Sequence, residues 1–301
     1  MISNSKDPKE KRASLRKALK SGKLLRMPGA TSPLVAKLIE QLGFDGVYVS
    51  GAVMSNDLGF PDIGMTTLSE VAHRASRIAQ VTALPSLVDA DTGFGETMNV
   101  HRTVKELEYM GLAGCHLEDQ ENPKRCGHLD HKTLTGVREM CRKIRAASDA
   151  KADSNFLVIA RTDARTELGL EKAIERAKAY ADAGAEMIFP EALADEREFE
   201  AFRKAVDLPL LANMTEFGKS RLLTADQLSN LGFNLVIYPV TAQRLAMFAV
   251  ESGLRHIMEH GTQESILDRM QTRSRLYEVL EYEAYSAFDQ SLYNFELTDS
   301  Q

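Results

Sequence analysis

The feature that most constrains the fold of this chain is a repeated alternation of short apolar runs with longer amphipathic segments. Eight runs are rich in Val, Ile and Leu and lack the strict apolar–polar alternation of a half-exposed strand, which is typical of parallel strands buried on both faces. The runs are Leu24–Met27, Gly46–Val49, Ser86–Val88, Gly114–Leu117, Phe156–Ala160, Met187–Phe189, Leu208–Ala212 and Leu235–Tyr238.

Between these runs, apolar residues recur with helical spacing, and glycines follow several of the segments where a left-handed helix cap is expected. Eight alternating β and α units in about 230 residues predict the α/β class and a (β/α)8 TIM barrel. An open, doubly wound sheet is the alternative, and the lack of a G-x-G-x-x-G turn after the first run argues against it. The clearest helical segments are Ser32–Leu42, Leu68–Val81, Asn99–Met110, Leu170–Ala183 and Thr241–Ser252.

A charged segment with helical spacing follows the eighth unit, from Thr262 to Tyr293. We therefore expect residues 1–301 to form a single barrel domain with a C-terminal helical extension over about residues 262–293. The extension contains enough apolar residues, such as Ile266 and Leu280, to require a partner surface. An oligomer interface is the prediction, and packing of the extension on its own barrel is an equally open alternative.

Composition excludes several classes of protein. The chain has 37 Lys and Arg against 43 Asp and Glu, a net charge of −6, which argues against nucleic acid or an anionic membrane as the main partner. It has no apolar run of the roughly 18–20 residues that a membrane span needs, and residues 1–23 lack the apolar core of a secretory signal. Its three cysteines fit free thiols, and no clustered Cys/His set predicts structural zinc. We expect a cytoplasmic protein.

Polar residues follow almost every predicted strand, and in a barrel these strand ends meet at one rim. Asp89 and Asp91 lie two residues apart after the third run, so on an extended segment both carboxylates face the same way. Glu118, after the fourth run, could add a third carboxylate directly or through water. An all-oxygen set with room for water suits Mg²⁺, for which Mn²⁺ could substitute. Asp89 and Asp91 are therefore the predicted metal ligands.

A polar loop with the sequence Lys124-Arg125-Cys126-Gly127-His128 follows the fourth predicted strand. Its cationic residues predict a lowered pKa of the Cys126 thiol and a population of thiolate. Gly127 would let the backbone approach a ligand closely. Cys115 lies in an apolar run and Cys141 in a helical stretch, so both are expected to be packing residues.

Three arginines are candidates for carboxylate recognition, because a guanidinium pairs with a carboxylate through two parallel hydrogen bonds. Arg161 is the best of them, since an arginine at the end of a buried strand is costly without an anionic partner. An ion pair with Asp163 or Glu191 is the alternative. Together with Arg244 and Arg273, it predicts a small substrate with two or three carboxylates.

With Asp89-Ala90-Asp91-Thr92-Gly93-Phe94-Gly95 upstream, the cysteine loop resembles that of the isocitrate lyase/phosphoenolpyruvate mutase superfamily. The resemblance spans about residues 20–290 of the 301, and the K-[KR]-C-G-H loop is its most specific part. The K-R-C-G-H form in a chain of this length is similar to the 2-methylisocitrate lyase family. Isocitrate lyases usually carry K-K-C-G-H in much longer chains, and the phosphonate mutases and oxaloacetate decarboxylases lack the cysteine loop.

The resemblance implies a Mg²⁺-dependent barrel enzyme that forms a homotetramer by exchanging C-terminal helices between subunits. It implies Asp89 and Asp91 as metal ligands and Cys126 as a catalytic group. The loop Ser50-Gly51-Ala52-Val53 departs from the Ser-Gly-Gly-Gly that relatives tend to have, which leaves its backbone contacts open. The implied substrate contacts are Ser50, Gly51, Ala52, Gly127, Arg161, Glu191, Asn213, Met214, Thr215, Arg244 and Arg273.

The implied reaction cleaves a carbon–carbon bond of 2-methylisocitrate to give pyruvate and succinate, a step of propionate catabolism in the methylcitrate cycle. Tyr48, Glu118 or a metal-linked group would take the hydroxyl proton, and Cys126 would return a proton to the carbanion. Phe189 and Ile237 are candidate walls for the substrate methyl group, or else ordinary barrel core. An isocitrate lyase or oxaloacetate decarboxylase of the same superfamily is the alternative; a silent scaffold would be expected to have lost a carboxylate or the cysteine.

Overall fold

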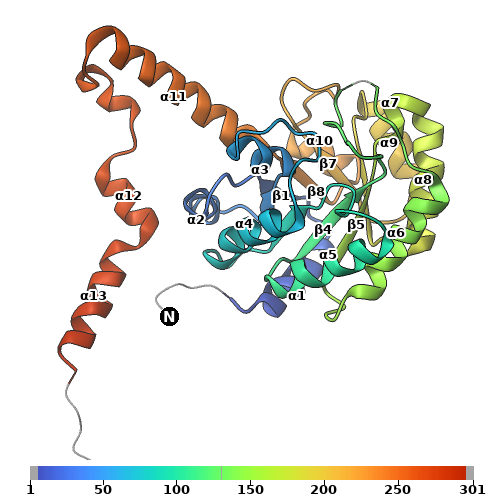
Figure 1. The fold of residues 1–301 in the computed structure, drawn as a ribbon, viewed down its shortest axis with the longest axis horizontal. Helices are drawn as coiled ribbons and strands as arrows, with labels where there is room; N and C mark the ends of the chain where they lie inside the picture. Colours follow the sequence, from blue (N-terminus) through green and yellow to red (C-terminus); the bar gives the residue numbers. More distant parts are fainter. Residues whose placement is uncertain (1–5, 130, 296–301) are drawn as a thin grey trace, which may run out of the picture. The chain divides into compact units, whose positions relative to one another are not determined.

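The computed structural model of this protein describes residues 6–129 and 131–295. Its residues group into two compact units, divided between Arg244 and Leu245. The first unit holds the strands and the helices packed around them, and the second holds most of helix α11 and the helices that follow it (Figure 1).

The eight strands of the described chain form a closed parallel barrel. β2 to β6 pair in sequence order, and β7, β8 and β1 pair in a second ladder. Two bridges join the ladders, Gly29 with Tyr48 and Ile188 with Leu210, so that β1 adjoins β2 and β6 adjoins β7. The predicted barrel is therefore confirmed. The strands are β1 (Leu25–Pro28), β2 (Val47–Val49), β3 (Ser86–Asp89), β4 (Gly114–Glu118), β5 (Leu157–Thr162), β6 (Met187–Pro190), β7 (Leu211–Asn213) and β8 (Leu235–Tyr238).

Helices surround the strands, and several begin at residues that cap them. Ser32 caps α2, and Thr67 and Glu70 form a reciprocal capping box at the start of α4. Four of the five predicted helices are confirmed to within two residues, and the fifth, α11, continues to His260. The helices that begin in this unit are α1 (Pro8–Leu19), α2 (Pro33–Gln41), α3 (Gly51–Asp57), α4 (Leu68–Gln80), α5 (Thr97–Tyr109), α6 (Val137–Ala150), α7 (Ala164–Leu168), α8 (Leu170–Ala183), α9 (Glu196–Ala205), α10 (Ala225–Asn230) and α11 (Thr241–His260).

The barrel interior is a hydrophobic cluster that α1 closes at the amino ends of the strands. Inward residues of the strands, such as Met27 and Ile159, form this cluster together with Leu15 and Leu19 of α1. Arg16 of α1 donates to the carbonyl oxygen of Phe156, which lies just before β5. Because α1 fills one end of the barrel, the carboxyl ends of the strands remain as the place for a site.

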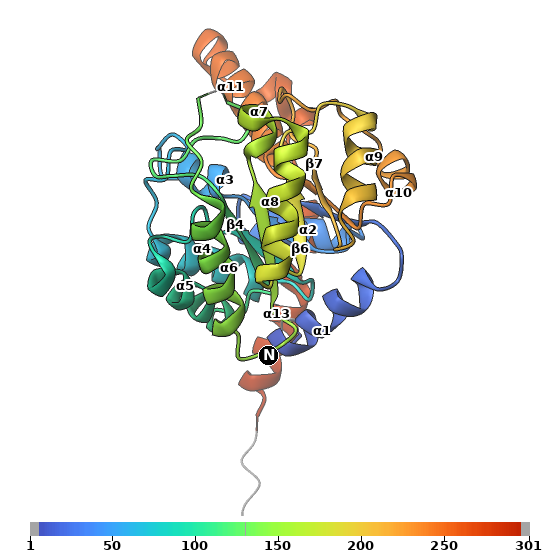
Figure 2. The same ribbon diagram turned by 90° about the vertical axis from the view of Figure 1, so that its right-hand side faces the viewer.

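A second and larger hydrophobic cluster lies between the strands and the surrounding helices. Alanines are frequent on the buried faces of these helices, for example Ala72 and Ala75 of α4 and Ala173 and Ala177 of α8. Small side chains let the helices lie close to the strands, and Figure 2 shows α6 and α8 side by side over them. This outer layer holds the strand ends in fixed positions.

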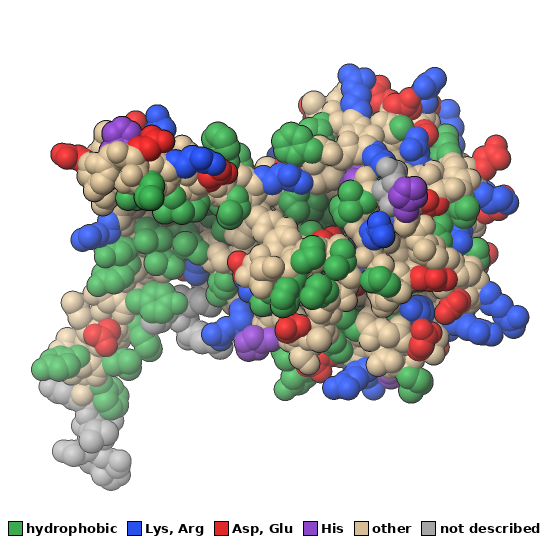
Figure 3. Space-filling model, turned by 45° about the horizontal axis from the view of Figure 1, so that its top comes forward, with side chains coloured by type: hydrophobic (Ala, Val, Ile, Leu, Met, Phe, Trp, Pro, Cys, Tyr) green, Lys and Arg blue, Asp and Glu red, His purple; other side chains and the backbone are tan. Residues whose placement is uncertain are grey.

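The second unit is helical and presents many apolar side chains to solvent. After α11 it contains the 3₁₀ helix η1 (Glu264–Arg269), α12 (Arg273–Leu280) and α13 (Tyr282–Tyr293). Hydrophobic side chains gather along these helices (Figure 3), and Phe248 and Met258 are 78% and 89% exposed. No helix in the described ranges is both long and apolar enough to cross a membrane. The expected helical extension is thus present, and its use in oligomerisation stays a prediction.

Candidate functional site

The rim at the carboxyl ends of the strands begins with the passage from β2 into α3. Ser50 caps α3, and its Oγ accepts a hydrogen bond from the amide of Val53 at 3.5 Å. The next residue, Gly51, donates its amide to Oδ2 of Asp89 at 3.3 Å. Ala52 follows in the first turn and is half-buried. The predicted loop after the second strand therefore starts a helix whose amino end adjoins the candidate metal carboxylates.

Asp89 and Asp91 converge on one point beside α3. A β-carbon on Gly51 would lie 2.7 Å from Oδ2 of Asp89 and 3.2 Å from Oδ1 of Asp91. Asp91 adopts a left-handed backbone with φ of 46°, which costs about 1–2 kcal/mol for a residue with a side chain. Its amide donates to Oδ1 of Asp89 at 3.0 Å, so this turn brings the two carboxylates together. Lys124 Nζ lies 2.8 Å from Oδ1 of Asp91 and also pairs with Asp62.

The charges at this point fit a hard divalent cation. Burial raises the pKa of Asp91 to about 6, against the opposing charge of Lys124. Burial also raises the pKa of Glu118 well above its usual value, and in the described structure neither oxygen of Glu118 accepts a hydrogen bond. Within residues 6–129 and 131–295, no three His, Cys, Asp or Glu side chains form a complete metal cage. Two carboxylates with open positions are what Mg²⁺ uses when water and substrate complete its shell.

Tyr48 and His116 form a buried pair on the inner face of the barrel. Tyr48 Oη lies 2.7 Å from His116 Nε2, and the two rings are nearly parallel, with centroids 5.9 Å apart. Burial raises the pKa of the Tyr48 phenol well above its usual value and lowers the pKa of His116. At neutral pH the phenol is therefore protonated and the imidazole is neutral, and the tautomer of His116 sets which of them donates in this hydrogen bond. His116 Nε2 also lies 3.6 Å from Oδ1 of Asp89, which connects this pair to the carboxylates.

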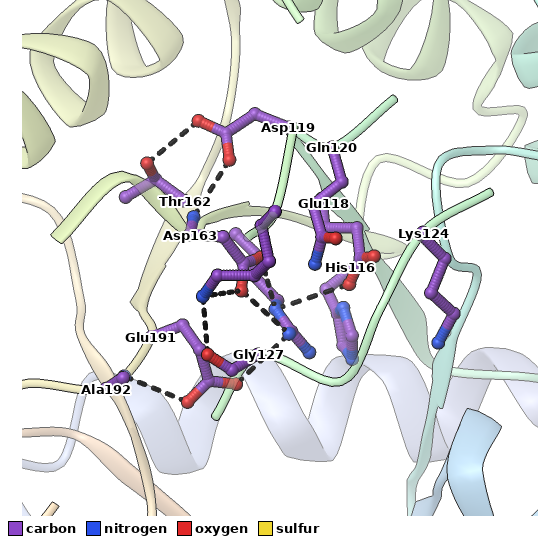
Figure 4. Close-up of polar contacts among 12 residues, drawn as sticks. His116, Glu118, Asp119, Gln120, Lys124, Gly127, Thr162, Asp163, Glu191 and Ala192 are labelled. Atoms are coloured by element: carbon purple, nitrogen blue, oxygen red, sulfur yellow. Dashed lines mark hydrogen bonds and ion pairs between the residues drawn. The ribbon is translucent and has the colours of Figure 1, made fainter. Parts of the chain in front are cut away.

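Arg161 lies at the end of β5 among the carboxylates of Glu118, Asp163 and Glu191. These three acidic residues are labelled in Figure 4. Its Nε and Nη2 donate to the two oxygens of Asp163 at 3.0 and 3.1 Å. Nη2 is 3.3 Å from Oε2 of Glu191, and Nε is 3.4 Å from Oε2 of Glu118. The structure therefore shows the ion pairs of Arg161 with Asp163 and Glu191 that were the alternative to substrate recognition. These partners outweigh burial and raise the pKa of Arg161, so it is a fixed positive charge in the wall of the site.

The cysteine loop lies against this arginine. A β-carbon on Gly127 would lie 2.4 Å from Nη2 of Arg161, 2.4 Å from Cγ of Glu191 and 2.8 Å from Oδ1 of Asp163. Only a glycine lets the backbone come this close to these side chains, and the approach of Gly127 to a ligand stays a prediction. The contact places Cys126, the preceding residue, at the same rim as the carboxylates.

The prediction of a lowered pKa for the Cys126 thiol is wrong. Burial raises its pKa, and the negative charge of Glu191 adds to the effect. Of the basic residues of the loop, Lys124 pairs with Asp91 and Asp62, while His128 Nδ1 accepts a hydrogen bond from the Lys219 amide and its Nε2 lies 3.0 Å from Oε1 of Glu191. Cys126 is therefore a protonated thiol at neutral pH, which suits a group that gives a proton.

Glu191 joins the loop to the end of β7. Asn213 Nδ2 donates to both oxygens of Glu191 at 3.3 Å. Burial opposes the charge of Glu191, but Arg161 and His128 outweigh it and hold its pKa well below the usual value. Among the described atoms, Oδ1 of Asn213 is buried and accepts no hydrogen bond, so it could accept one from a bound ligand.

Three further predicted substrate contacts follow β7 and β8, and they do not all lie at the site. Met214 packs in the outer hydrophobic layer, and its sulfur accepts a hydrogen bond from the amide of Leu223 at 3.2 Å, so the structure does not bring it to the cluster. Thr215 is half-buried one residue later. Arg244 lies 3.5 Å from Glu216 at about half exposure.

Arg273 and the candidate methyl-pocket residues also differ in their placement. Arg273 begins α12 and belongs to the second unit. Phe189 and Ile237 both belong to the inner hydrophobic cluster, which agrees with the alternative that they are ordinary barrel core. Phe189 nevertheless borders the site, because the guanidinium of Arg161 lies 5.1 Å from the centre of its ring.

Two residues that hold the site together were not found from the sequence. Asp119 accepts hydrogen bonds from Thr162 Oγ1, the Asp163 amide and Tyr180 Oη, at 2.8, 2.8 and 2.7 Å. Asp119 directly follows Glu118, so the two side chains point to opposite faces of the strand end. This alternation is the sequence signal that could have indicated a supporting role for Asp119. Lys132 bonds the carbonyl oxygen of Gly127 and lies 3.2 Å from Asp163. No local pattern marks it, because its partners come from the fold of the loop.

Comparisons with known proteins show the family of this chain. The family model for phosphoenolpyruvate phosphomutase matches residues 15–258. A Corynebacterium glutamicum protein called "Probable 2-methylisocitrate lyase 2" is 59% identical over 98% of this chain and 96% of its own. A 2-methylisocitrate lyase of Aeropyrum pernix is 48% identical over 91% of this chain and 89% of its own.

Solved structures give the same result. An oxaloacetate acetylhydrolase in complex with 3,3-difluorooxalacetate has a TM-score of 0.89 at 33% identity, covering 97% of this chain and 100% of that one. A phosphonopyruvate hydrolase in complex with oxalate and Mg²⁺ has a TM-score of 0.84 at 33% identity, over 93% and 98% of the two chains. The chain therefore belongs to the 2-methylisocitrate lyase family of the phosphoenolpyruvate mutase/isocitrate lyase superfamily.

Proposed function

We propose that this protein is a Mg²⁺-dependent lyase that cleaves 2-methylisocitrate into pyruvate and succinate. The observation that carries the proposal is the protonated Cys126 thiol, held at the same barrel rim as the converging carboxylates of Asp89 and Asp91. A retro-Claisen cleavage needs these two kinds of group, a cation site for the substrate hydroxyl and an acid for the carbanion. The names of the relatives support the choice of substrate.

Asp89 and Asp91 would hold the metal ion, with Glu118 close enough to act through water. Bound there, Mg²⁺ would supply Lewis-acid polarisation of the substrate's hydroxyl and its neighbouring carboxylate. The complex of the similar phosphonopyruvate hydrolase with oxalate and Mg²⁺ supports this cofactor. Mn²⁺ also suits an all-oxygen site and would be expected to substitute.

The proton of the substrate hydroxyl needs a base, for which Tyr48, Glu118 and a metal-linked group are the candidates. The phenol of Tyr48 is protonated at neutral pH because burial raises its pKa. Glu118 has two buried oxygens that accept no hydrogen bond in the described structure, so either of them could accept the proton of the substrate hydroxyl. We therefore favour Glu118 as the base and Tyr48 as a hydrogen-bond donor.

Cleavage leaves a carbanion next to a carboxylate on the succinate half, and Cys126 would give it a proton. Arg161, with Asn213 and Thr215, would stabilise the charge that develops on that carboxylate. The protons balance, because the base takes one proton from the substrate hydroxyl and the Cys126 thiol gives one proton to the carbanion. Ser50, Gly51, Ala52, Gly127 and Glu191 would line the substrate space, with Arg244 and Arg273 as further carboxylate contacts.

The test is a paired assay with Mg²⁺, in which the purified protein receives 2-methylisocitrate or isocitrate. We expect pyruvate and succinate from the first and little glyoxylate from the second. Cys126→Ser should abolish turnover while Mg²⁺ binding is retained, and Cys141→Ser, on α6, is the matched control that should keep full activity. Excess glyoxylate would make the protein a compact isocitrate lyase. Neither product, with Mg²⁺ bound, would overturn the proposal and direct the search to oxaloacetate.

We further propose that the protein works in the cytoplasm as a homotetramer in which C-terminal helices are exchanged between subunits. The apolar side chains of α11 to α13 support this, since no residue of α11 or α13 is buried within the chain. Such a surface is larger than soluble monomers usually expose. Light scattering should give about four times the 33.4 kDa chain mass, and a monomer at micromolar concentration would contradict the proposal.

A further inference from the structure

Lys132 is a fully buried lysine whose ammonium group contacts two parts of the site. Its side chain has no exposed surface, and Nζ lies 3.2 Å from Oδ1 of Asp163, which is equally buried. The same Nζ donates a hydrogen bond to the carbonyl oxygen of Gly127. Lys132 therefore connects the cysteine loop to the end of β5 by a single side chain, and we call these two contacts the Lys132 bridge.

Asp163, at one end of the bridge, is fixed from several directions. Its amide donates to Oδ1 of Asp119 at 2.8 Å, so its backbone position is set by a second buried carboxylate. Its own carboxylate accepts two hydrogen bonds from Arg161. Any group that binds Asp163 is thus held at a defined place relative to the arginine in the wall of the site.

Gly127, at the other end, immediately follows Cys126. The backbone of Gly127 already lies as close to Arg161 and Glu191 as an unsubstituted carbon can. Because Gly127 is joined to Cys126 by a planar peptide bond, a shift of the Gly127 backbone would also move Cys126. The bridge opposes that shift, because it ties the oxygen to Asp163.

The energetics favour a positional role for this lysine. Removing an ammonium from water costs several kcal/mol, and a buried ion pair regains this only when its geometry is good. An apolar side chain in the same place would avoid that cost, so folding stability alone does not account for a buried lysine. What an apolar side chain could not do is hold a loop carbonyl and a carboxylate at one point.

We propose that Lys132 is a positioning residue, which through the Lys132 bridge sets the place of the Cys126 thiol relative to Arg161. The proposal rests on the proposed function, in which the thiol gives a proton to the carbanion. Lys132 touches neither the reacting atoms nor the metal ligands. It acts on the reaction only through the Gly127 backbone and Asp163.

The first test measures the loop without using the reaction. Cys126 in the full-length protein is alkylated with iodoacetamide at neutral pH, and the modified peptide is followed by mass spectrometry. In Lys132→Met we expect alkylation about tenfold faster than in the wild type, because a displaced thiol loses the burial that raises its pKa. Cys141 is the internal reference. Lys11→Met is the matched control, since Lys11 is also buried and donates to a carbonyl, that of Ala79 at 2.8 Å, far from this loop.

The second test separates positioning from folding. In Lys132→Met, kcat for 2-methylisocitrate should fall by about 10²-fold, as for a misplacement near 1 Å, while KM changes little. Ethylammonium should raise the kcat of Lys132→Ala, whereas tetramethylammonium, which has no N–H, should not. If Lys132 had a merely structural role, neither ammonium ion would raise the kcat of Lys132→Ala. If Lys132→Met does not fold, Lys132→Gln fills a similar volume without the charge, and faster Cys126 alkylation is expected there too.

The outcomes distinguish this inference from the proposed function. Wild-type alkylation and kcat in folded Lys132→Met, with normal cleavage of 2-methylisocitrate, would overturn the bridge and leave the function standing. Faster alkylation in a protein that cleaves no 2-methylisocitrate would support the bridge and overturn the function.

Discussion

The sharpest test of the site geometry is Gly127→Ala, which adds one methyl group to the cysteine loop. The added carbon would meet Nη2 of Arg161 and Cγ of Glu191 at 2.4 Å each. Ordinary contact begins near 3.4 Å, so the loop or the wall must move by about 1 Å. The wall is buried and braced by ion pairs, whereas the loop has an exposed side. We therefore expect the loop to move and to carry Cys126 with it.

A displacement of about 1 Å at a reacting group costs about 10²-fold in rate, or roughly 2.7 kcal/mol of transition-state stabilisation. The backbone of Gly127 is not left-handed, so alanine adds no conformational strain and the fold should keep its stability. The predicted signature is thus a loss of kcat in a protein that melts normally and binds Mg²⁺ normally.

Steady-state kinetics with 2-methylisocitrate and thermal melting check this prediction. Gly136→Ala is the matched control, because Gly136 ends the same loop at φ of −61° and a β-carbon there would meet nothing within 4 Å. It should keep the wild-type kcat. Full activity in Gly127→Ala would refute the reasoning, since it would show that catalysis does not need the loop against Arg161.

Three further predictions concern the metal, the thiol and the support of the wall. Asp91→Asn should weaken Mg²⁺ binding about 100-fold or more by calorimetry, and an unchanged affinity would remove Asp91 from the metal site. Because burial raises the pKa of the Cys126 thiol, kcat should hold to about pH 8.5 and fall only as pH rises further; a fall near pH 7 would contradict this assignment. Tyr180→Phe removes a buried 2.7 Å hydrogen bond to Asp119 and should cost about 1–3 kcal/mol of unfolding free energy in urea, whereas Tyr109→Phe, 85% exposed, should cost almost nothing.

The barrel could be predicted from the sequence because its strands are buried on both faces and therefore composed almost entirely of apolar residues. The run Leu235–Tyr238 coincides with β8 at both ends. The largest error is at β7, where the apolar run begins at Leu208 but the strand begins at Leu211. Pro209 lies between them, and a proline cannot donate to a strand ladder.

Helix α11 shows a different limit. The helical spacing predicted a segment that ends at Ser252, yet the helix continues through Gly253 to His260. A glycine inside a helix costs only about 1 kcal/mol relative to alanine, which the surrounding turns can supply. Where the helix ends depends on the helix propensities summed over the whole segment, and a single residue does not give that sum.

The site was predictable where chemistry follows the strand ends and not where it depends on how a loop folds back. Asp89 and Asp91 could be found because both follow a buried apolar run, although a turn at Asp91, with φ of 46°, and not an extended segment brings their carboxylates together. The Lys132 bridge could not, because its partners lie 5 and 31 residues away and meet only in the folded loop. Met214 is the opposite case, since its place after β7 indicated the site but its side chain packs outward.

The pKa of Cys126 shows why charges counted along a sequence can mislead. Lys124 and His128 flank the thiol in sequence, which would favour a thiolate if their charges were free. Lys124 instead pairs with Asp91, and His128 Nδ1 accepts a hydrogen bond from the Lys219 amide, so burial decides the direction of the pKa shift of the thiol. The two results predict different chemistry, because a thiolate attacks carbon and a thiol gives a proton. Protonation of a carbanion needs a thiol, so the raised pKa of Cys126 agrees with its proposed role as the proton donor.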